Sequence, residues 1–96
     1  MKRFILLRRV VGPSMAPKLM PGQLVVATSW FRKLHPGQVV IIRRNNRELV
    51  KRIERIEDNK VFVIGDNLAA STDSRQFGWL DYRFIVARVI RPNLAK

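Results

Sequence analysis

The chain has 96 residues, 47% hydrophobic and 27% charged, which predicts one small globular domain over residues 1–96 and excludes a disordered chain. It contains no cysteine and one histidine, so disulfides, thiol catalysis and clusters of cysteine or histidine metal ligands are excluded. The net charge of +12 lies mostly in residues 1–47, which hold ten Lys or Arg and no acid; such a field attracts nucleic acid, anionic membranes or acidic proteins.

Short apolar runs rich in β-branched residues and separated by turn residues predict a mainly β protein built of small, coiled antiparallel sheets. No window has the apolar stripe of a helix of three or more turns. The expected strands are residues 3–10, 23–28, 38–43, 48–56, 60–64 and 82–91. Short helical turns are expected around residues 29–34 and 74–80.

Turn residues stand between these strands. The pairs Pro21-Gly22 and Pro36-Gly37 each precede an apolar strand, and Pro-Gly is typical of a type II turn. Asn45-Asn46 and Asp58-Asn59 are typical of hairpin turns, because Asn and Asp tolerate left-handed backbone. The strands from residue 38 to residue 64 should therefore form a meander.

The sequence predicts no membrane span, since its longest apolar runs have four residues and a spanning helix needs roughly 20. The basic start of the chain, residues 1–9, lacks the apolar stretch of a secretory signal and is interpreted as the first strand. We expect a cytoplasmic protein, or one in peripheral contact with an anionic membrane surface.

The first segment that can carry chemistry is Gly12-Pro13-Ser14-Met15-Ala16-Pro17. Two prolines and a glycine keep it out of regular structure and stiffen it. Ser14 is therefore displayed on a rigid loop after a strand, as a nucleophile requires, although a lone serine in such a turn is usually only a turn residue.

The second segment is the expected strand around Lys51. On a strand, Leu49, Lys51 and Ile53 share one face, so the ammonium group would lose hydration and its pKa would fall. A neutral lysine can act as a general base. Arg55, expected on the same face, favours the alternative that Lys51 extends into solvent at a sheet edge.

The third segment runs from Gly65 to Arg75 and is rich in short polar side chains. Asp73 and Arg75 are expected to form an ion pair that holds the loop, and Ser71 or Ser74 can hydrogen-bond a neighbouring polar group. A long, self-capped surface loop is the alternative interpretation.

Two other features are given structural interpretations. His35 precedes a Pro-Gly turn and has no acidic neighbour in sequence, so it is expected to be a turn residue rather than part of a triad. Trp30-Phe31, beside two basic residues, can stack on bases or enter a membrane surface, but such a pair more often belongs partly to the core.

Taken in order, the three segments resemble the signal peptidase I family of serine endopeptidases. The nucleophile box Ser-Met-x-Pro is matched by residues 14–17, the Lys-Arg box by Lys51-Arg52, and the Gly-Asp-Asn box by residues 65–75. The resemblance covers roughly residues 10–90, and three boxes in order are more specific than any one alone.

The resemblance implies a Ser/Lys dyad with Ser14 as nucleophile and Lys51 as base. It also implies that Ser71 orients Lys51, that the backbone at Gly12 and Ser14 forms the oxyanion hole, and that three residues of the last box are structural: Asp66, Asp73 and Arg75. It implies neither a cofactor nor a metal. The expected partner is a precursor protein carrying a leader peptide.

Several departures from the family pattern refine this hypothesis. Only 13 residues precede Ser14, which leaves no room for the anchoring helix of membrane-bound relatives, and residues 53–64 suffice for a hairpin rather than an extra β domain. The chain is similar to the short, unanchored proteases that mature nickel-type superoxide dismutase. General preprotein processing at a membrane is the close alternative.

Two further hypotheses remain. A basic β domain that binds nucleic acid would explain the N-terminal charge and Trp30-Phe31 but leaves the three boxes unexplained, so nucleic acid is the less favoured partner. A self-cleaving repressor shares the Ser/Lys arrangement but carries a DNA-binding helical domain and an Ala-Gly cleavage site, neither of which residues 1–13 contain.

Overall fold

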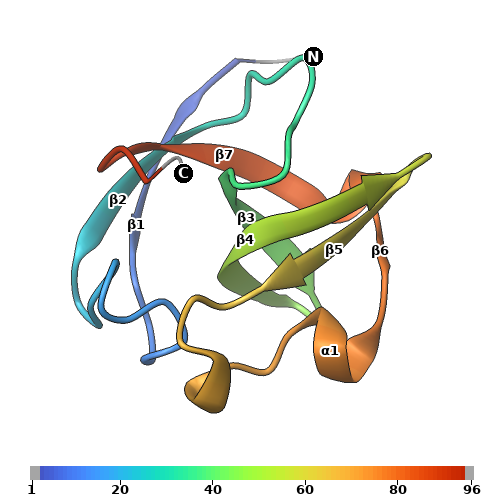
Figure 1. The fold of residues 1–96 in the computed structure, drawn as a ribbon. Helices are drawn as coiled ribbons and strands as arrows, with labels where there is room; N and C mark the ends of the chain where they lie inside the picture. Colours follow the sequence, from blue (N-terminus) through green and yellow to red (C-terminus); the bar gives the residue numbers. More distant parts are fainter. Residues whose placement is uncertain (1–2, 95–96) are drawn as a thin grey trace.

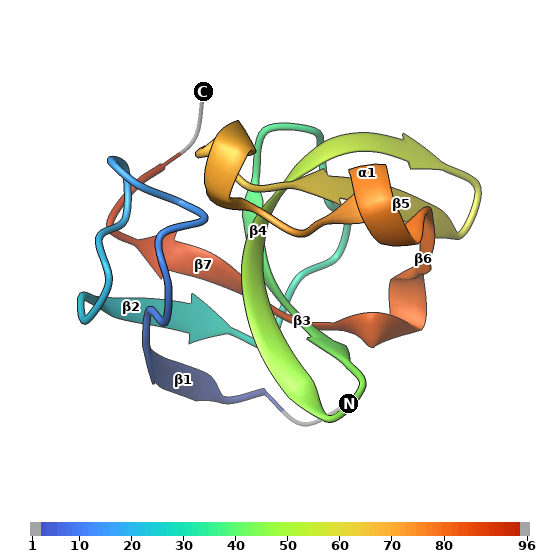
Figure 2. The same ribbon diagram turned by 90° about the horizontal axis from the view of Figure 1, so that it is seen from below.

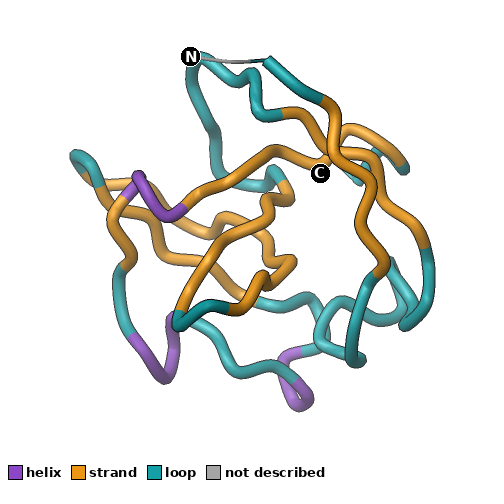
Figure 3. The backbone as a smooth tube through the Cα atoms, turned by 180° about the vertical axis from the view of Figure 1, so that it is seen from behind, coloured by secondary structure: helices purple, strands orange, loops and turns teal. Residues whose placement is uncertain are grey.

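The computed structural model describes residues 3–94 as a curled sheet of seven strands with few helical turns. Figure 1 shows the strands wrapping around the middle of the molecule, and Figure 3 shows that the helical segments lie in the connections between strands. The elements in chain order are β1 (Ile5–Arg9), β2 (Leu24–Thr28), β3 (Val39–Arg44), β4 (Arg47–Glu57), β5 (Lys60–Ile64), η1 (Leu68–Ala70), α1 (Ser74–Phe77), β6 (Leu80–Asp81), η2 (Tyr82–Phe84) and β7 (Ile85–Arg91). The expected mainly β, antiparallel fold is confirmed.

All strand pairs are antiparallel, in the spatial order β1-β2-β7-β3-β4-β5-β6. The meander β3-β4-β5 has the expected turns. Asn45 and Asn46 both have positive φ, at 52° and 63°, and Asp58 has φ 52°. Left-handed backbone at both central residues gives the twist that matches the flanking strands of a hairpin.

The core consists of two apolar clusters that share strand β3. Val39 and Ile41 face the first cluster, and Val40 and Ile42 face the second, because successive side chains of a strand point to opposite faces. All four are buried, so β3 is covered on both sides by the curled sheet. The first cluster also contains Met15, which belongs to the loop that carries Ser14.

Three expectations about local structure are corrected. Residues 29–34 form no helical turn, and the helix predicted over residues 74–80 ends at Phe77, where Gly78 with φ 84° forms the C-cap. The strand expected over residues 82–91 begins with the 3-10 turn η2, and the short strand β6 was not predicted. These segments are too short for periodicity to identify, and their conformation follows from long-range contacts.

A bulge in β4 corrects the expected position of Arg55. Ile53 pairs with Val63 and Arg55 pairs with Phe62, so two steps along β4 match a single step along β5. Consecutive residues of β5 point to opposite faces, and Ile53 and Arg55 therefore do so as well. Arg55 is exposed and lies over the Phe62 ring, with 5.2 Å between its guanidinium carbon and the ring centroid. The argument that Arg55 draws Lys51 to a solvated edge is wrong.

Candidate active site

The loop between β1 and β2 displays Ser14 because the residues around it are anchored. Met15 and Leu19 are fully buried in the first core cluster. Val10 is tied to the far end of the loop by hydrogen bonds to Gln23 and Gly22, each 2.8 Å between backbone nitrogen and oxygen. Ser14 itself is half-buried. An apolar anchor directly after the serine thus fixes where its side chain can lie.

The loop from Gly65 to Asp73 docks onto the Ser14 loop. The Asn67 backbone N–H donates to the Ser14 carbonyl at 2.8 Å, and the Asn67 side-chain amide donates to the Pro13 carbonyl at 3.1 Å. The Asp66 backbone N–H lies 3.4 Å from the Met15 sulfur. The first and third predicted segments, 50 residues apart in sequence, are therefore in direct contact. Figure 2 shows the β1–β2 loop beside η1 and the adjoining half of β4.

Gly65 permits this close approach. A Cβ atom at this position would lie 2.6 Å from the Ser14 carbonyl oxygen and 2.6 Å from Ser71 Cβ, and closer still to the Ser71 hydroxyl. No real Cβ atom tolerates such distances. The glycine of the Gly-Asp-Asn box therefore serves packing between the two loops.

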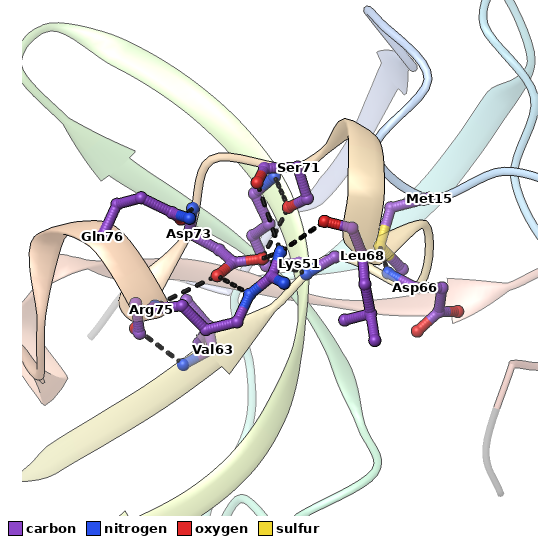
Figure 4. Close-up of polar contacts among 11 residues, drawn as sticks. Met15, Lys51, Val63, Asp66, Leu68, Ser71, Asp73, Arg75 and Gln76 are labelled. Atoms are coloured by element: carbon purple, nitrogen blue, oxygen red, sulfur yellow. Dashed lines mark hydrogen bonds and ion pairs between the residues drawn. The ribbon is translucent and has the colours of Figure 1, made fainter.

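Lys51 is buried, with 3% of its surface exposed, and does not reach solvent at a sheet edge. Its Nζ donates to Ser71 Oγ at 3.0 Å, and Ser71 Oγ donates to Asp73 Oδ2 at 2.6 Å. A hydroxyl has a single proton, and since Ser71 gives it to the carboxylate, Ser71 must accept from Lys51. Figure 4 shows this chain of contacts from Lys51 through Ser71 to Asp73.

Burial lowers the pKa of Lys51, because the charged ammonium loses hydration. The Asp73 carboxylate acts in the opposite direction and raises the pKa of Lys51, while the Arg75 guanidinium lowers it. The net effect is downward. This increases the fraction of neutral amine, the form with a free lone pair that can accept a proton.

Asp73 is fully buried and ionised. Burial alone would raise the pKa of this carboxyl, but hydrogen bonds from the Arg75 side chain, the Ser71 hydroxyl and the Gly65 and Arg75 backbone hold it well below its usual range. The expected ion pair with Arg75 is present, with 2.9 Å between Nε and Oδ1. Asp73 also caps α1 through a capping box with Gln76.

Asp66 has a partner that was not predicted. Its two carboxylate oxygens accept from Nε and Nη2 of Arg52, each at 2.8 Å; the Arg52 side chain is buried and that of Asp66 is mostly covered, with 10% exposed. Arg52 also donates to the backbone carbonyls of Gly37 and Leu94. Lys51 and Arg52 follow one another on β4 and point to opposite sides, so the pair holds two parts of the same loop. In the sequence, the adjacent basic residues Lys51 and Arg52 were the feature that could have indicated this second contact.

Ser14 and Lys51 line the same two pockets beside β4. Val11, Arg47 and Leu49 also line both pockets. The first, named here the Val50 pocket, is lined in addition by Arg8, Val10, Met15, Ile41, Glu48 and Val50. The second, the Phe77 pocket, is lined by the same five shared residues and by Gly12, Arg44, Asn45, Ala70, Thr72 and Phe77. Gly12 has φ 80° with open space around it, so it shapes the loop at the edge of the Phe77 pocket.

Among the described residues, two strand edges beside these pockets have no pairing partner. Residues 47–51 of β4 pair with β3 on one side, and pairing with β5 begins only at Arg52. Within residues 3–94, β1 pairs only with β2. An extended peptide lying along residues 47–51 would place alternate side chains in the two pockets, which is strand addition to a sheet edge.

The remaining predicted residues lie elsewhere. His35 is exposed, and its carbonyl accepts from Gln38 in the turn at residues 35–38, as expected for a turn residue. Trp30 is half exposed beneath the Arg3 guanidinium, and Phe31 packs against the second core cluster. In the described part of the chain, no three His, Asp or Glu side chains gather as a metal site would require.

The fold and the site are those of a small β-sheet protein with a serine and a buried lysine on one cleft. A comparison with protein families matches the Peptidase S24-like model to residues 2–89. The chain therefore belongs to this family, one of serine peptidases and self-cleaving repressor-type proteins. A search of curated proteins finds no match. None of the helices within residues 3–94 has the length and apolar character needed to cross a bilayer.

Proposed function

We propose that this protein is a serine endopeptidase that uses Ser14 as nucleophile and Lys51 as general base to remove a leader or signal peptide from a precursor protein. The observation that carries the proposal is the buried Lys51 amine, with its lowered pKa, on the same pockets as Ser14. Membership of the Peptidase S24-like family supports the reaction class.

The proposed reaction has two steps. Neutral Lys51 takes the proton of the Ser14 hydroxyl as its oxygen attacks the substrate carbonyl, and the resulting ammonium returns that proton to the leaving amine. The acyl-enzyme is then hydrolysed by a water that Lys51 deprotonates, and the resulting ammonium returns this proton to the Ser14 oxygen as the acyl bond breaks. The Ser14 and Gly12 backbone N–H groups are proposed as oxyanion donors, each worth about 10²–10³ in rate. The Lys51 hydrogen bond to Ser71 would hold the amine in place throughout.

The experiment is cleavage of a peptide library by the parent and by Ser14→Ala and Lys51→Met variants, with new peptide ends identified by mass spectrometry. Both variants should lose cleavage while circular dichroism shows the parent fold. Lys60→Met, a change at an exposed strand lysine, is the matched control and should retain activity. A phosphonate probe should label Ser14. If Ser14→Ala cuts as fast as the parent, the mechanism is wrong.

The finer proposal concerns the substrate. The resemblance to short, unanchored proteases suggests that the precursor is a nickel-type superoxide dismutase, with the leader peptide released. The test is incubation with such a precursor and determination of the new N-terminus. A single cut at the leader boundary supports this substrate, and an uncut precursor together with cleavage of other peptides refutes it while leaving the endopeptidase proposal intact.

A second candidate is preprotein processing at a membrane surface. Ile5 and Leu7 alternate on the exposed face of β1, 60% and 61% exposed, with basic residues in the same strand. Exposed apolar side chains with nearby cations suit an anionic bilayer surface. Cleavage that rises when the substrate is presented on anionic vesicles would favour this candidate over a substrate in solution.

Self-cleavage is the alternative within the same family. It makes the chain itself the substrate, whereas the proposal above requires cutting of a separate molecule. Mass spectrometry of the purified protein after incubation at alkaline pH separates the two. A cut within the parent chain that is absent from Lys51→Met would favour self-cleavage.

A further inference from the structure

Two arginines lie directly opposite one another at the end of the β3–β4 hairpin. Arg44 and Arg47 are cross-strand partners on either side of the Asn45-Asn46 turn. Like charges in this position destabilise a hairpin. The next pair along contrasts with it, since Arg43 faces Glu48 and forms an ion pair of 3.2 Å. The like-charged pair is therefore not explained by the needs of the hairpin.

The pair lacks a neutralising acid among residues 3–94. In the part of the chain that the structure describes, neither Arg44 nor Arg47 has a carboxylate within 4.0 Å. Glu48 is the only acidic residue lining either pocket of the cleft. Its two oxygens already accept from Arg8 at 2.7 Å and Arg43 at 3.2 Å, so the Glu48 carboxylate is paired with these two arginines and does not neutralise Arg44 or Arg47.

Arg44 is held in position by an aromatic ring. Its guanidinium carbon lies 4.2 Å from the centroid of Phe77, the last residue of α1. Stacking uses the face of the guanidinium and leaves the N–H groups at its edge able to bind a planar anion. Arg44 is half-buried, which strengthens any charge-assisted hydrogen bond that it makes.

The pair lies on the pocket that also holds the proposed catalytic residues. Arg44 and Arg47 line the Phe77 pocket together with Ser14 and Lys51. Arg47 precedes Lys51 by four residues on β4, which is about 13 Å along a strand and the length of four residues of an extended peptide. A side chain about four residues from the scissile bond, pointing into this pocket, would reach the arginines.

We infer that Arg44 and Arg47 form an anion subsite that selects substrates carrying an aspartate or glutamate about four residues from the cleaved bond. This inference rests on the proposed endopeptidase function and names a feature of its substrate. Arg47 lines both pockets, but Arg44 lines only the Phe77 pocket. Since neighbouring side chains of an extended peptide point to opposite faces, the preference should fall on the one position that faces Arg44 and be weaker at the positions next to it.

The test uses the library cleavage of the parent, with Ser14→Ala as background. The peptides that are cut should be enriched in Asp or Glu at one position about four residues from the cleaved bond. Two synthetic peptides that differ only by Glu or Gln at that position then give a ratio of kcat/KM, expected to be roughly tenfold in favour of Glu. In the double variant Arg44→Gln, Arg47→Gln this ratio should fall to about one. The matched control Arg32→Gln, Lys33→Gln removes the same charge from an exposed loop at another pocket and should keep the ratio.

The outcomes separate this inference from the function on which it rests. The subsite is refuted, and the peptidase proposal unaffected, if cleavage is specific but the cut sites show no enrichment in Asp or Glu. The same holds if the kcat/KM ratio of the Glu and Gln peptides is unchanged in the double variant of Arg44 and Arg47. If the parent cuts nothing beyond background, the peptidase fails, and fluorescence anisotropy of Glu and Gln peptides on Ser14→Ala decides the subsite alone. Equal binding of the two peptides overturns it, as does arginine-dependent binding of an oligonucleotide or anionic vesicles in place of acidic peptides.

Discussion

Substitution of Gly65 by alanine tests whether the two loops must touch for the site to exist. The added methyl group would meet the Ser14 carbonyl oxygen and Ser71 Cβ at 2.6 Å, about 1 Å closer than ordinary contact. The loops must therefore separate or distort. Insertion of a methyl group into a well-packed position typically costs 1–3 kcal/mol, and the lower entropy of an unfolded chain with alanine returns at most about 1 kcal/mol.

The expected loss for Gly65→Ala is about 1–2 kcal/mol. For a domain of this size, each kcal/mol lowers the melting temperature by roughly 4–8 °C, so differential scanning calorimetry should find a fall of about 10 °C. At a temperature where the variant is still folded, the rate of peptide cleavage should fall by at least about tenfold, because the displaced loops carry both Ser14 and Ser71.

Gly22→Ala is the matched control. Gly22 has open space around its added Cβ but a φ of 89°, so alanine there is strained by about 1–2 kcal/mol without contact between loops. Alanine keeps the backbone N–H that Gly22 donates to Val10 in the Ser14 loop, so the variant should have a lower melting temperature but cleave near the parent rate when folded. A Gly65→Ala protein with the melting temperature and cleavage rate of the parent would refute the close-packing argument.

Three other changes give separate tests. Cleavage should rise with pH as Lys51 loses its proton, with a midpoint below the ordinary lysine pKa, and stability should rise across the same window because the unfolded chain binds the proton more tightly; a rate that is flat from mildly acidic to alkaline pH contradicts a lysine base. Asp66→Asn leaves the buried Arg52 guanidinium without its counter-charge and should cost about 3 kcal/mol in urea unfolding, whereas a loss below about 1 kcal/mol would show that the backbone carbonyls suffice. Met15→Ala removes a fully buried anchor and should cost about 2–5 kcal/mol and also slow cleavage, and an unchanged rate in the folded variant would mean that Met15 does not position Ser14.

Sequence patterns were sufficient where local chemistry decides the structure. The Pro-Gly and Asn-Asn pairs located turns because few other residues accept positive φ, and Gly22, Gly37 and both asparagines indeed have it. Strands β2, β3 and β5 begin and end within one residue of the predicted bounds, since each is an apolar run between turn residues. The membrane-contact prediction and the residue roles at the site concern function and stay predictions.

Other features depend on contacts that no local pattern contains. The bulge opposite Phe62 turns Arg55 to the other face of β4. The sequence analysis assumed that side chains alternate regularly through residue 54, and a regular alternation cannot detect a bulge. The partner of Asp66 was missed because Arg52 lies 14 residues earlier in the sequence and was considered only as the neighbour of Lys51. Asn67 likewise binds a loop more than 50 residues away.

The charges around Lys51 explain how an ionised carboxylate can lie so close to a lysine that must become neutral. Asp73 alone would stabilise the ammonium and oppose the effect of burial. Arg75 binds both oxygens of Asp73 and adds an opposing positive charge, which offsets part of the effect of the carboxylate at Lys51, and burial, the largest influence, decides the direction of its pKa. Asp73 can then serve as the acceptor that orients Ser71 without holding the proton on the amine. Replacement of Arg75 by an uncharged residue should therefore raise the pKa of Lys51 and move the midpoint of the cleavage rate to higher pH, a shift that loss of a merely structural contact would not produce.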